Sequence, residues 1–98
     1  MLKHSLFVRL EAKAGKEDEV AALLQQGLQL ANQETTTPLW FALRFGPTTF
    51  GVFDAFENET GRQTHLNGPI AKALMDNADR LLARPPTIDK IDLMAAKN

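Results

Sequence analysis

The sequence contains no cysteine and no tyrosine, and it has only two histidines, His4 and His65. The missing cysteines exclude disulfides, thiolate metal sites and cysteine nucleophiles. Two histidines are too few for a histidine-rich metal centre, so we expect no bound metal. The missing tyrosines exclude a tyrosyl acid or radical relay, which narrows the chemistry that the chain can perform.

Neither charge nor hydrophobicity dominates any part of the 98 residues. Eleven basic and twelve acidic residues give a net charge of −1 without a basic block, so we expect no nucleic-acid partner. No apolar stretch approaches the ~18 residues that span a bilayer. Residues 1–10 include Arg9 and lack a small-residue cleavage site, so we expect no signal peptide. At roughly the length of one domain, the sequence predicts a single cytoplasmic domain over residues 1–98.

Hydrophobic patterns in the first half predict a strand, a helix and two further strands. Residues 4–12 alternate between apolar and polar side chains, which is typical of a strand. An apolar stripe with helical spacing covers residues 20–31, where we expect the helix to end. Two runs rich in aromatic and β-branched residues, 39–45 and 49–56, predict strands joined by a short hairpin turn.

The second half predicts an interrupted helix and a last strand. Asn58 is a suitable N-cap, and Gly68-Pro69 predicts a kink or restart before the helix ends near Ala83. Residues 87–94 read as a strand after two prolines. The resulting βαββαβ order predicts an α+β fold, the ferredoxin-like subunit.

Both faces of the two middle strands carry apolar side chains, although two helices cover only one face of a four-stranded sheet. An exposed apolar patch of this size would be abnormal for a monomer. We therefore expect a homodimer formed by sheet-to-sheet packing about a two-fold axis. The alternative is a loosely covered sheet with a few exposed aromatic residues. The opposing sets are Leu39, Phe41, Leu43 and Phe45 against Trp40 and Ala42, and Phe50, Val52 and Phe56 against Gly51, Phe53 and Ala55.

Three segments, WFALR at 40–44, FGVFDAF at 50–56 and HLNGP at 65–69, resemble the antibiotic biosynthesis monooxygenase (ABM) family. The resemblance covers nearly the whole chain. It implies a dimeric α+β barrel of ferredoxin-like subunits. It also implies oxidation of electron-rich phenols or quinols by O₂, often without metal, flavin or haem, so we expect no cofactor. Residues such as Phe7, Phe56 and Met75 stand where haem-degrading relatives carry Asn, Trp and His, which argues against haem breakdown.

His65 is the first catalytic candidate. Deprotonating a phenol makes electron transfer to O₂ easier, and a neutral imidazole with a pKa near ~6.5 suits that proton transfer. The alternative is a structural role, in which the His65 side chain hydrogen-bonds a carbonyl freed at the kink by Gly68-Pro69.

Arg44 is the second catalytic candidate, because positive charge in a dry site stabilises a phenolate or superoxide. Arg44 could instead pair with a carboxylate such as Asp54 or Glu11, and this structural role is the favoured one for Arg9.

Substrate-binding candidates are the aromatic residues of the middle strands with one methionine from the second helix. They suit a flat aromatic ligand, although aromatic residues on strands are more often plain core or interface. The leading hypothesis is a cofactor-independent monooxygenase acting on a small aromatic quinol or polyphenol. The alternatives are a non-catalytic binding module for a small hydrophobic ligand and a purely structural dimer. The candidates are Trp40, Phe50, Phe53, Phe56 and Met75.

Overall fold

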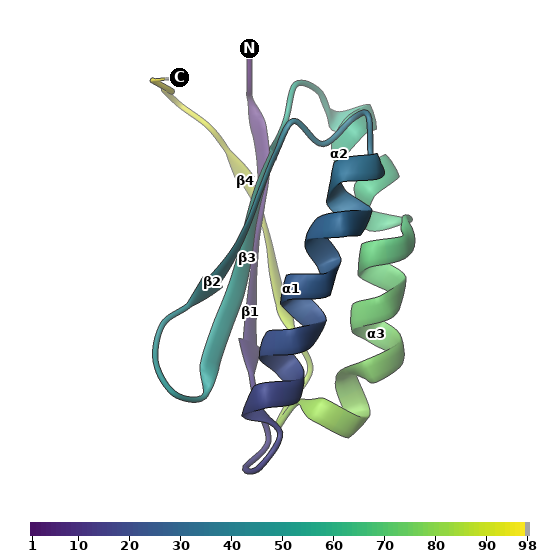
Figure 1. The fold of residues 1–98 in the computed structure, drawn as a ribbon. Coiled ribbons are helices and arrows are strands. Elements are labelled where there is room, and N and C mark those ends of the chain that lie inside the picture. Colours follow the sequence, from purple (N-terminus) through teal and green to yellow (C-terminus); the bar gives the residue numbers. More distant parts are fainter. Residues whose placement is uncertain (98) are drawn as a thin grey trace.

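The computed structural model describes residues 1–97, in which one layer of helices covers one face of an antiparallel sheet (Figure 1). This arrangement confirms the βαββαβ order and the ferredoxin-like fold, with the second helix split in two. The strands are β1 (His4–Glu11), β2 (Leu39–Arg44), β3 (Thr49–Phe56) and β4 (Thr87–Asp92), in the spatial order β2-β3-β1-β4; the helices are α1 (Glu17–Gln33), α2 (Glu59–Leu66) and α3 (Pro69–Leu81).

The predicted N-cap and the predicted break of the second helix are both confirmed. Asn58 is extended, and its side chain accepts a hydrogen bond from the Gly61 N–H at 2.8 Å, which satisfies a free donor of the first turn. Gly68 separates α2 from α3, and Pro69 occupies the first turn of α3, where its missing N–H costs no helical hydrogen bond. The helix then ends at Leu81, slightly earlier than expected.

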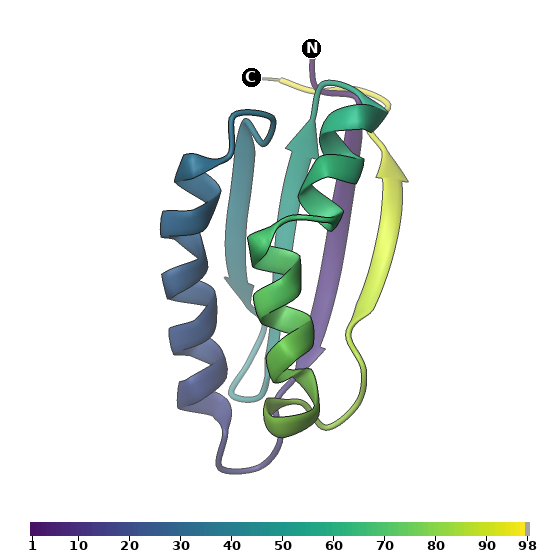
Figure 2. The same ribbon diagram turned by 90° about the vertical axis from the view of Figure 1, so that its right-hand side faces the viewer.

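Strand register decides which side chains face the helices. In the antiparallel pairs, Leu6 lies opposite Asp54 and Asp54 opposite Trp40, so these three side chains share one face. The same alternation turns the apolar side of β1 toward α1 and α3. Figure 2 shows α1 beside β2, α2 and α3 in front of the central strands, and β4 without a helix in front of it. The core under the helices includes Val8, Leu10, Val20, Leu24, Phe50, Val52 and Leu81.

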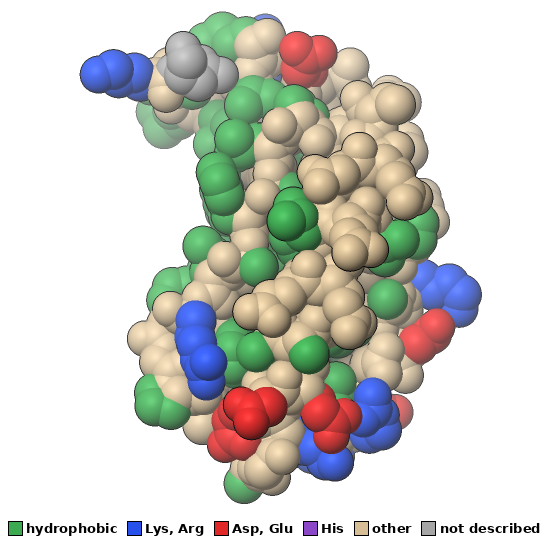
Figure 3. Space-filling view, in the orientation of Figure 1, with side chains coloured by type: hydrophobic (Ala, Val, Ile, Leu, Met, Phe, Trp, Pro, Cys, Tyr) green, Lys and Arg blue, Asp and Glu red, His purple; other side chains and the backbone are tan. Residues whose placement is uncertain are grey.

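The other face of the sheet carries aromatic side chains that no helix covers. Phe41 and Phe45 are 50% and 51% exposed. The Phe7 and Phe45 rings meet edge to face at 6.0 Å, and the Arg9 guanidinium lies 4.7 Å above the Phe45 ring. Arg9 therefore contacts an aromatic ring on this face and not Asp54, which points to the opposite face. In Figure 3, hydrophobic side chains follow the left side of the molecule, where Figure 1 shows this open face.

Among residues 1–97, no helix has both the length and the apolar character that crossing a bilayer requires.

Candidate functional site

A buried histidine lies between two carboxylates on the helix side of the sheet. His65 Nδ1 is 2.7 Å from Glu34 Oε1, and His65 Nε2 is 3.0 Å from Asp54 Oδ2. The side chains of His65, Asp54 and Glu34 are only 6%, 1% and 14% exposed. We call these three residues the carboxylate–histidine cluster. Because carboxylates engage both ring nitrogens, the His65 side chain does not form the capping hydrogen bond that a structural role at the helix break would need.

Arg62 holds α2 against the sheet one turn before His65. Its Nη1 donates to the carbonyl oxygens of Ser5 at 3.2 Å and Ile91 at 3.3 Å, and its Nε donates to Glu59 at 2.6 Å. The side chain is almost fully buried, so these contacts connect α2 to both β1 and β4. Residues three apart on a helix share a face, so this anchor also directs His65 toward the sheet.

Glu34 is the C-cap residue of α1, a place where a carboxylate faces the negative end of the helix dipole. The unfavourable position is offset by contacts from outside the helix. The Thr37 hydroxyl donates to Glu34 Oε1 at 2.7 Å, and the same oxygen lies against His65. Thr37 is buried. The connection between α1 and β2 therefore delivers a carboxylate to the histidine.

Burial and charge set the protonation of the cluster. Burial raises the pKa of Asp54, against the opposing effect of the His65 contact, and the negative charge of Glu34 adds to the rise. Burial alone would lower the pKa of His65, but the close contacts and negative charges of Asp54 and Glu34 outweigh it, so the pKa of His65 is raised. The imidazole therefore holds its proton to higher pH than usual, and Asp54 is a stronger base than an ordinary aspartate.

A small cavity of about 50 Å³ lies between the sheet and helices α2 and α3, with Asp54 and His65 in its wall. A volume of this size has room for water or dioxygen, whereas a cavity that holds benzene measures about 150 Å³. An aromatic ring can enter only if the lining moves. The rest of the lining is apolar and includes Leu6, Val8, Val52, Ile70, Leu74 and Met75.

Several polar atoms around the cluster are buried without a hydrogen-bond partner: Trp40 Nε1, Glu34 Oε2 and both Asp54 carboxylate oxygens. The 3.0 Å approach of His65 to Asp54 is thus an ion pair that is poorly aligned for a hydrogen bond. Trp40 lies beside Asp54 in the register, and its ring is 3.3 Å from where a Cβ on Gly27 would be. Buried polar atoms without partners are uncommon. Of Trp40, Glu34 and Asp54, only Asp54 lines the small cavity, so its carboxylate oxygens are the ones that a donor group in the cavity would satisfy.

The structure brings only some of the other expected residues to the cluster. Phe56 packs on His65 with ring centroids 5.4 Å apart, and Met75 lines the cavity. Phe50 is buried in the core, on the same face but toward the other end of the strand. Phe53 lies on the open face, since an odd step along β3 reverses the direction of a side chain. The aromatic residues expected to bind one flat ligand therefore do not line a single cavity in this structure.

Arg44 lies apart from His65. Its register partner is Phe50, four residues from Asp54 along β3, a separation of about 13 Å at ~3.3 Å per residue. The guanidinium donates to the carbonyl oxygens of Gly46 and Pro47 at 3.1 and 3.0 Å and lies 4.7 Å above the Phe50 ring. It thus stabilises the β2–β3 turn, and the expected pairing of Arg44 with Asp54 or Glu11 is not formed.

Sequence reasoning missed Glu34 and Thr37, and it offered Asp54 only an arginine as a partner. Two signals were available. Asp54 is a charged residue at an apolar position of an otherwise apolar strand, and burying an unpaired charge is costly. Glu34 follows a helix whose last turn contains no basic residue, so a carboxylate there needs a partner from elsewhere in the chain.

A comparison with protein-family models finds no match, and neither does a comparison with curated proteins. Solved structures do match. The NE2512 protein of Nitrosomonas europaea, of unknown function, is 61% identical with a TM-score of 0.97, over 100% of this chain and 95% of that one.

More distant structures share the fold. A candidate antibiotic biosynthesis monooxygenase from Deinococcus radiodurans is 22% identical with a TM-score of 0.82, over 97% of this chain and 96% of that one. The Rv0793 protein of Mycobacterium tuberculosis is 12% identical with a TM-score of 0.86, over 98% and 99%. The chain therefore belongs to the same family as the Nitrosomonas europaea NE2512 protein, and it has the fold of the antibiotic biosynthesis monooxygenases.

Proposed function

We propose that the protein is a cytoplasmic, cofactor-independent monooxygenase that oxidises a small aromatic quinol or polyphenol with O₂. The observation that carries this proposal is the carboxylate–histidine cluster at the wall of an apolar cavity. Buried ionisable groups with shifted pKa values beside a cavity are typical of catalytic sites. The fold, shared with the antibiotic biosynthesis monooxygenases, supports the same reaction class by analogy.

In this mechanism Asp54 takes the proton of the substrate hydroxyl. The raised pKa of Asp54 brings the carboxylate closer to the pKa of a phenol, which improves the transfer. His65, charged and held by Glu34, then stabilises the phenolate that forms. This assignment differs from the sequence-based hypothesis, in which His65 was the base and Arg44 stabilised the phenolate anion. Carboxylates engage both nitrogens of His65, and Arg44 binds the β2–β3 turn.

The oxygen step balances without another reductant. The phenolate transfers one electron to O₂, and the phenoxyl radical and superoxide combine at a ring carbon bearing hydrogen. The peroxide anion that forms takes back the proton held by Asp54, and the resulting hydroperoxide loses water to leave a quinone. One oxygen atom enters the product, the other leaves as water, and the substrate supplies all of the electrons. A simple oxidase would instead convert a quinol and O₂ into a quinone and hydrogen peroxide.

Oxygen uptake tests the proposal. Metal-stripped protein is given naphthalenediols and anthrone-like phenols, and uptake is measured with and without catalase. We expect turnover above autoxidation and no O₂ returned by catalase, since the monooxygenase stoichiometry releases water. Asp54→Asn keeps the size of the side chain and should lower kcat by about 10²-fold or more. The matched control Asp76→Asn removes an exposed carboxylate of α3 and should leave the rate unchanged.

A second candidate function is a non-catalytic binding module for a small hydrophobic ligand. The engagement of both His65 nitrogens favours it over a reaction with His65 as the base, because no ring nitrogen is free to accept a proton. Saturable binding of the phenols without oxygen uptake would select this function. Turnover that is equal in wild type and Asp54→Asn would instead remove Asp54 as the base.

We also propose that two copies pack sheet to sheet through the open face. The half-exposed Phe41 and Phe45 support this, since a large exposed apolar patch is typical of an interface. Light scattering should give the wild type a molar mass of twice the 10.9 kDa of one chain. The Phe41→Glu variant should have the mass of a single chain. A wild-type mass of one chain would contradict the dimer.

A further inference from the structure

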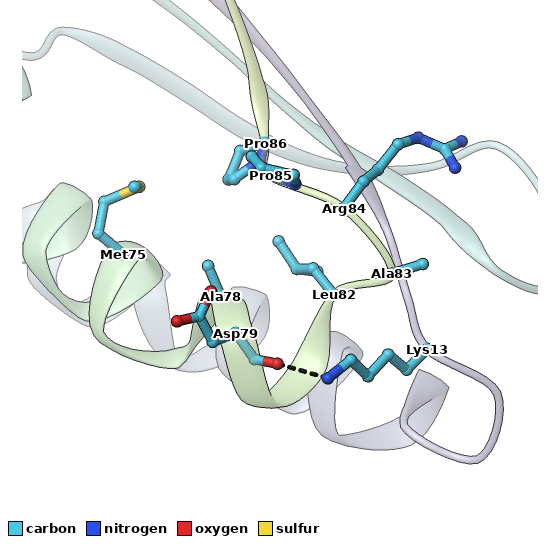
Figure 4. Close-up of a pocket in the computed structure, with 9 residues that line it drawn as sticks. All are labelled: Lys13, Met75, Ala78, Asp79, Leu82, Ala83, Arg84, Pro85 and Pro86. Carbon is cyan, nitrogen blue, oxygen red and sulfur yellow. Dashed lines mark hydrogen bonds between the residues drawn. The ribbon is translucent and has the colours of Figure 1, made fainter.

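A second and larger cavity lies at the end of α3, next to the one that contains Asp54 and His65. It measures about 530 Å³ and is bounded by the C-terminal half of α3 and the segment that leads into β4 (Figure 4). We call it the outer basin. Its apolar lining is Met75, Ala78, Leu82, Ala83, Pro85 and Pro86, and Lys13, Asp79 and Arg84 also border it. At more than three times the ~150 Å³ that holds benzene, the basin has room for a ring system.

We call the small cavity beside Asp54 and His65 the inner cavity. Met75 lines both the outer basin and the inner cavity, and no other residue among 1–97 does. The side chain is 56% exposed and unbranched, so it can change rotamer at little cost. On the opposite side of the basin, Pro85 and Pro86 form a wall whose backbone φ angles are fixed by their rings. The movable part of the boundary is therefore the part that separates the two cavities.

The charged groups at the basin carry an excess of positive charge. The Lys13 ammonium donates to the backbone carbonyl of Asp79, a contact that neutralises no charge (Figure 4). Within residues 1–97, neither Lys13 nor Arg84 forms an ion pair with a carboxylate. Arg84 lies near enough to Glu11 to lower the pKa of that carboxyl, although the two groups do not form an ion pair. In the part of the chain that the structure describes, Asp79 is the one carboxylate in the basin lining, against the two cations Lys13 and Arg84, so the lining favours an anionic group.

We propose that the outer basin is a second compartment of the substrate site, which binds the non-reacting end of an elongated aromatic substrate that carries a carboxylate. Met75 is the residue that separates the compartments and determines the length of substrate admitted. The reactive ring points toward Asp54 and His65, and the carboxylate lies toward Lys13 and Arg84. Only this orientation rests on the proposed function; the binding itself does not.

Equilibrium binding tests the charge preference. The probe is anthracene-2-carboxylate, a fluorescent three-ring acid, compared with neutral anthracene-2-carboxamide at low ionic strength. We expect the carboxylate to bind roughly tenfold more tightly, as a charge-assisted contact allows. The double variant Lys13→Gln/Arg84→Gln should abolish the preference. Lys72→Gln removes a cation of α3 that lines neither cavity and should retain it. Equal affinities in the wild type, or a preference that survives in the double variant, would overturn the proposal.

The three methionines locate the ligand. With ¹³C-methyl methionine, the Met75 resonance should shift on binding, whereas Met1 and Met94 lie outside both cavities and should not. Met75→Trp places a larger side chain at the boundary of the two cavities and should weaken binding of the carboxylate about tenfold, while circular dichroism checks that the fold is retained. An unmoved Met75 resonance, or unchanged binding in Met75→Trp, would contradict the location.

The binding measurement needs neither O₂ nor turnover, so it separates this proposal from the proposed function. A carboxylate preference that depends on Lys13 and Arg84, without oxygen uptake on any phenol, would support the outer basin as a binding site and contradict the monooxygenase function. Oxygen uptake that requires Asp54, without binding of the anthracene acid, would keep the monooxygenase and reject the basin as a substrate compartment.

Discussion

The two faces of the sheet carry aromatic side chains in opposite environments. On the side that the helices cover, Phe50 and Phe56 are almost completely buried, and a histidine with two carboxylates is buried beside them. On the open side, Phe41 and Phe45 are half exposed. An aromatic residue therefore says little by itself about where a ligand binds in this fold.

The polar groups separate the two faces more clearly. A buried charge is costly unless it is paired, and replacing a buried ion pair by apolar residues is often neutral or stabilising. The carboxylate–histidine cluster is thus weakly explained by stability and is better explained by chemistry. On the open face, Arg9 lies over an aromatic ring, an arrangement that suits a contact surface.

The largest expected effect on stability comes from a phenylalanine-to-alanine substitution made once on each face of the sheet. Phe50→Ala should lower the free energy of unfolding by about 3–5 kcal/mol, because it leaves a cavity in the core. Phe41→Ala should cost less than about 1 kcal/mol at a protein concentration where the chain is monomeric. Urea unfolding of both variants measures the difference. Similar losses in the two variants would show that the open face is covered in the folded subunit.

The fold was predictable because its determinants are local. Alternation in β1, the stripe of α1, the Asn58 cap and the Gly68-Pro69 break each depend on residues that are close in sequence, and the structure confirms each of them. Which side chains share one face of a strand also follows from the sequence, since successive side chains alternate between faces, but which of the two faces meets the helices does not.

The candidate site was only partly predictable because it is assembled from three distant segments. His65 is 31 residues from Glu34, and their contact depends on where α1 ends and how α2 packs. The separation of Arg44 from His65 was hidden for a related reason, since it depends on strand register and not on residue type. Sequence indicates which residues can do chemistry, and register decides which of them meet.

The next effect concerns the buried cluster itself. His65→Ala should lower the free energy of unfolding by about 3 kcal/mol, because it leaves Asp54 and Glu34 buried without their shared partner. Asp54→Asn should lower the free energy of unfolding by less than His65→Ala does, since it removes one of the two negative charges that His65 balances. Chemical denaturation at neutral pH compares the variants. A larger loss in Asp54→Asn than in His65→Ala would mean that the aspartate, and not the imidazole, balances the charge of the cluster.

A smaller effect is expected from pH, because titration changes the charge and keeps the side chains in place. The pKa of His65 and that of Asp54 are both raised by folding, so the folded chain holds protons more tightly than the unfolded chain. The free energy of unfolding should therefore be highest at low pH, as far as this pair is concerned, and fall as pH rises.

The contribution of His65 is complete below its ordinary pKa of 6.5 and is lost as pH rises through the raised value. Urea unfolding above pH 6 isolates this fall from the surface glutamates, whose lowered pKa values act at lower pH. In His65→Gln the dependence should be flatter. The same slope in wild type and variant would assign the pH dependence to other groups.

The smallest effect tests whether the α1–β2 connection positions the cluster. Thr37→Val keeps the shape of the side chain and removes the hydroxyl that donates to Glu34 Oε1, so it should cost about 1 kcal/mol of unfolding free energy. The control Thr64→Val removes an exposed hydroxyl that donates to a carbonyl within α2, and it should change stability by less than about 0.5 kcal/mol. Equal losses in the two variants would show that Thr37 does not hold Glu34. If only Thr37→Val loses unfolding free energy, and the His65 ring resonance shifts in that variant, then the α1–β2 connection positions His65 through Glu34.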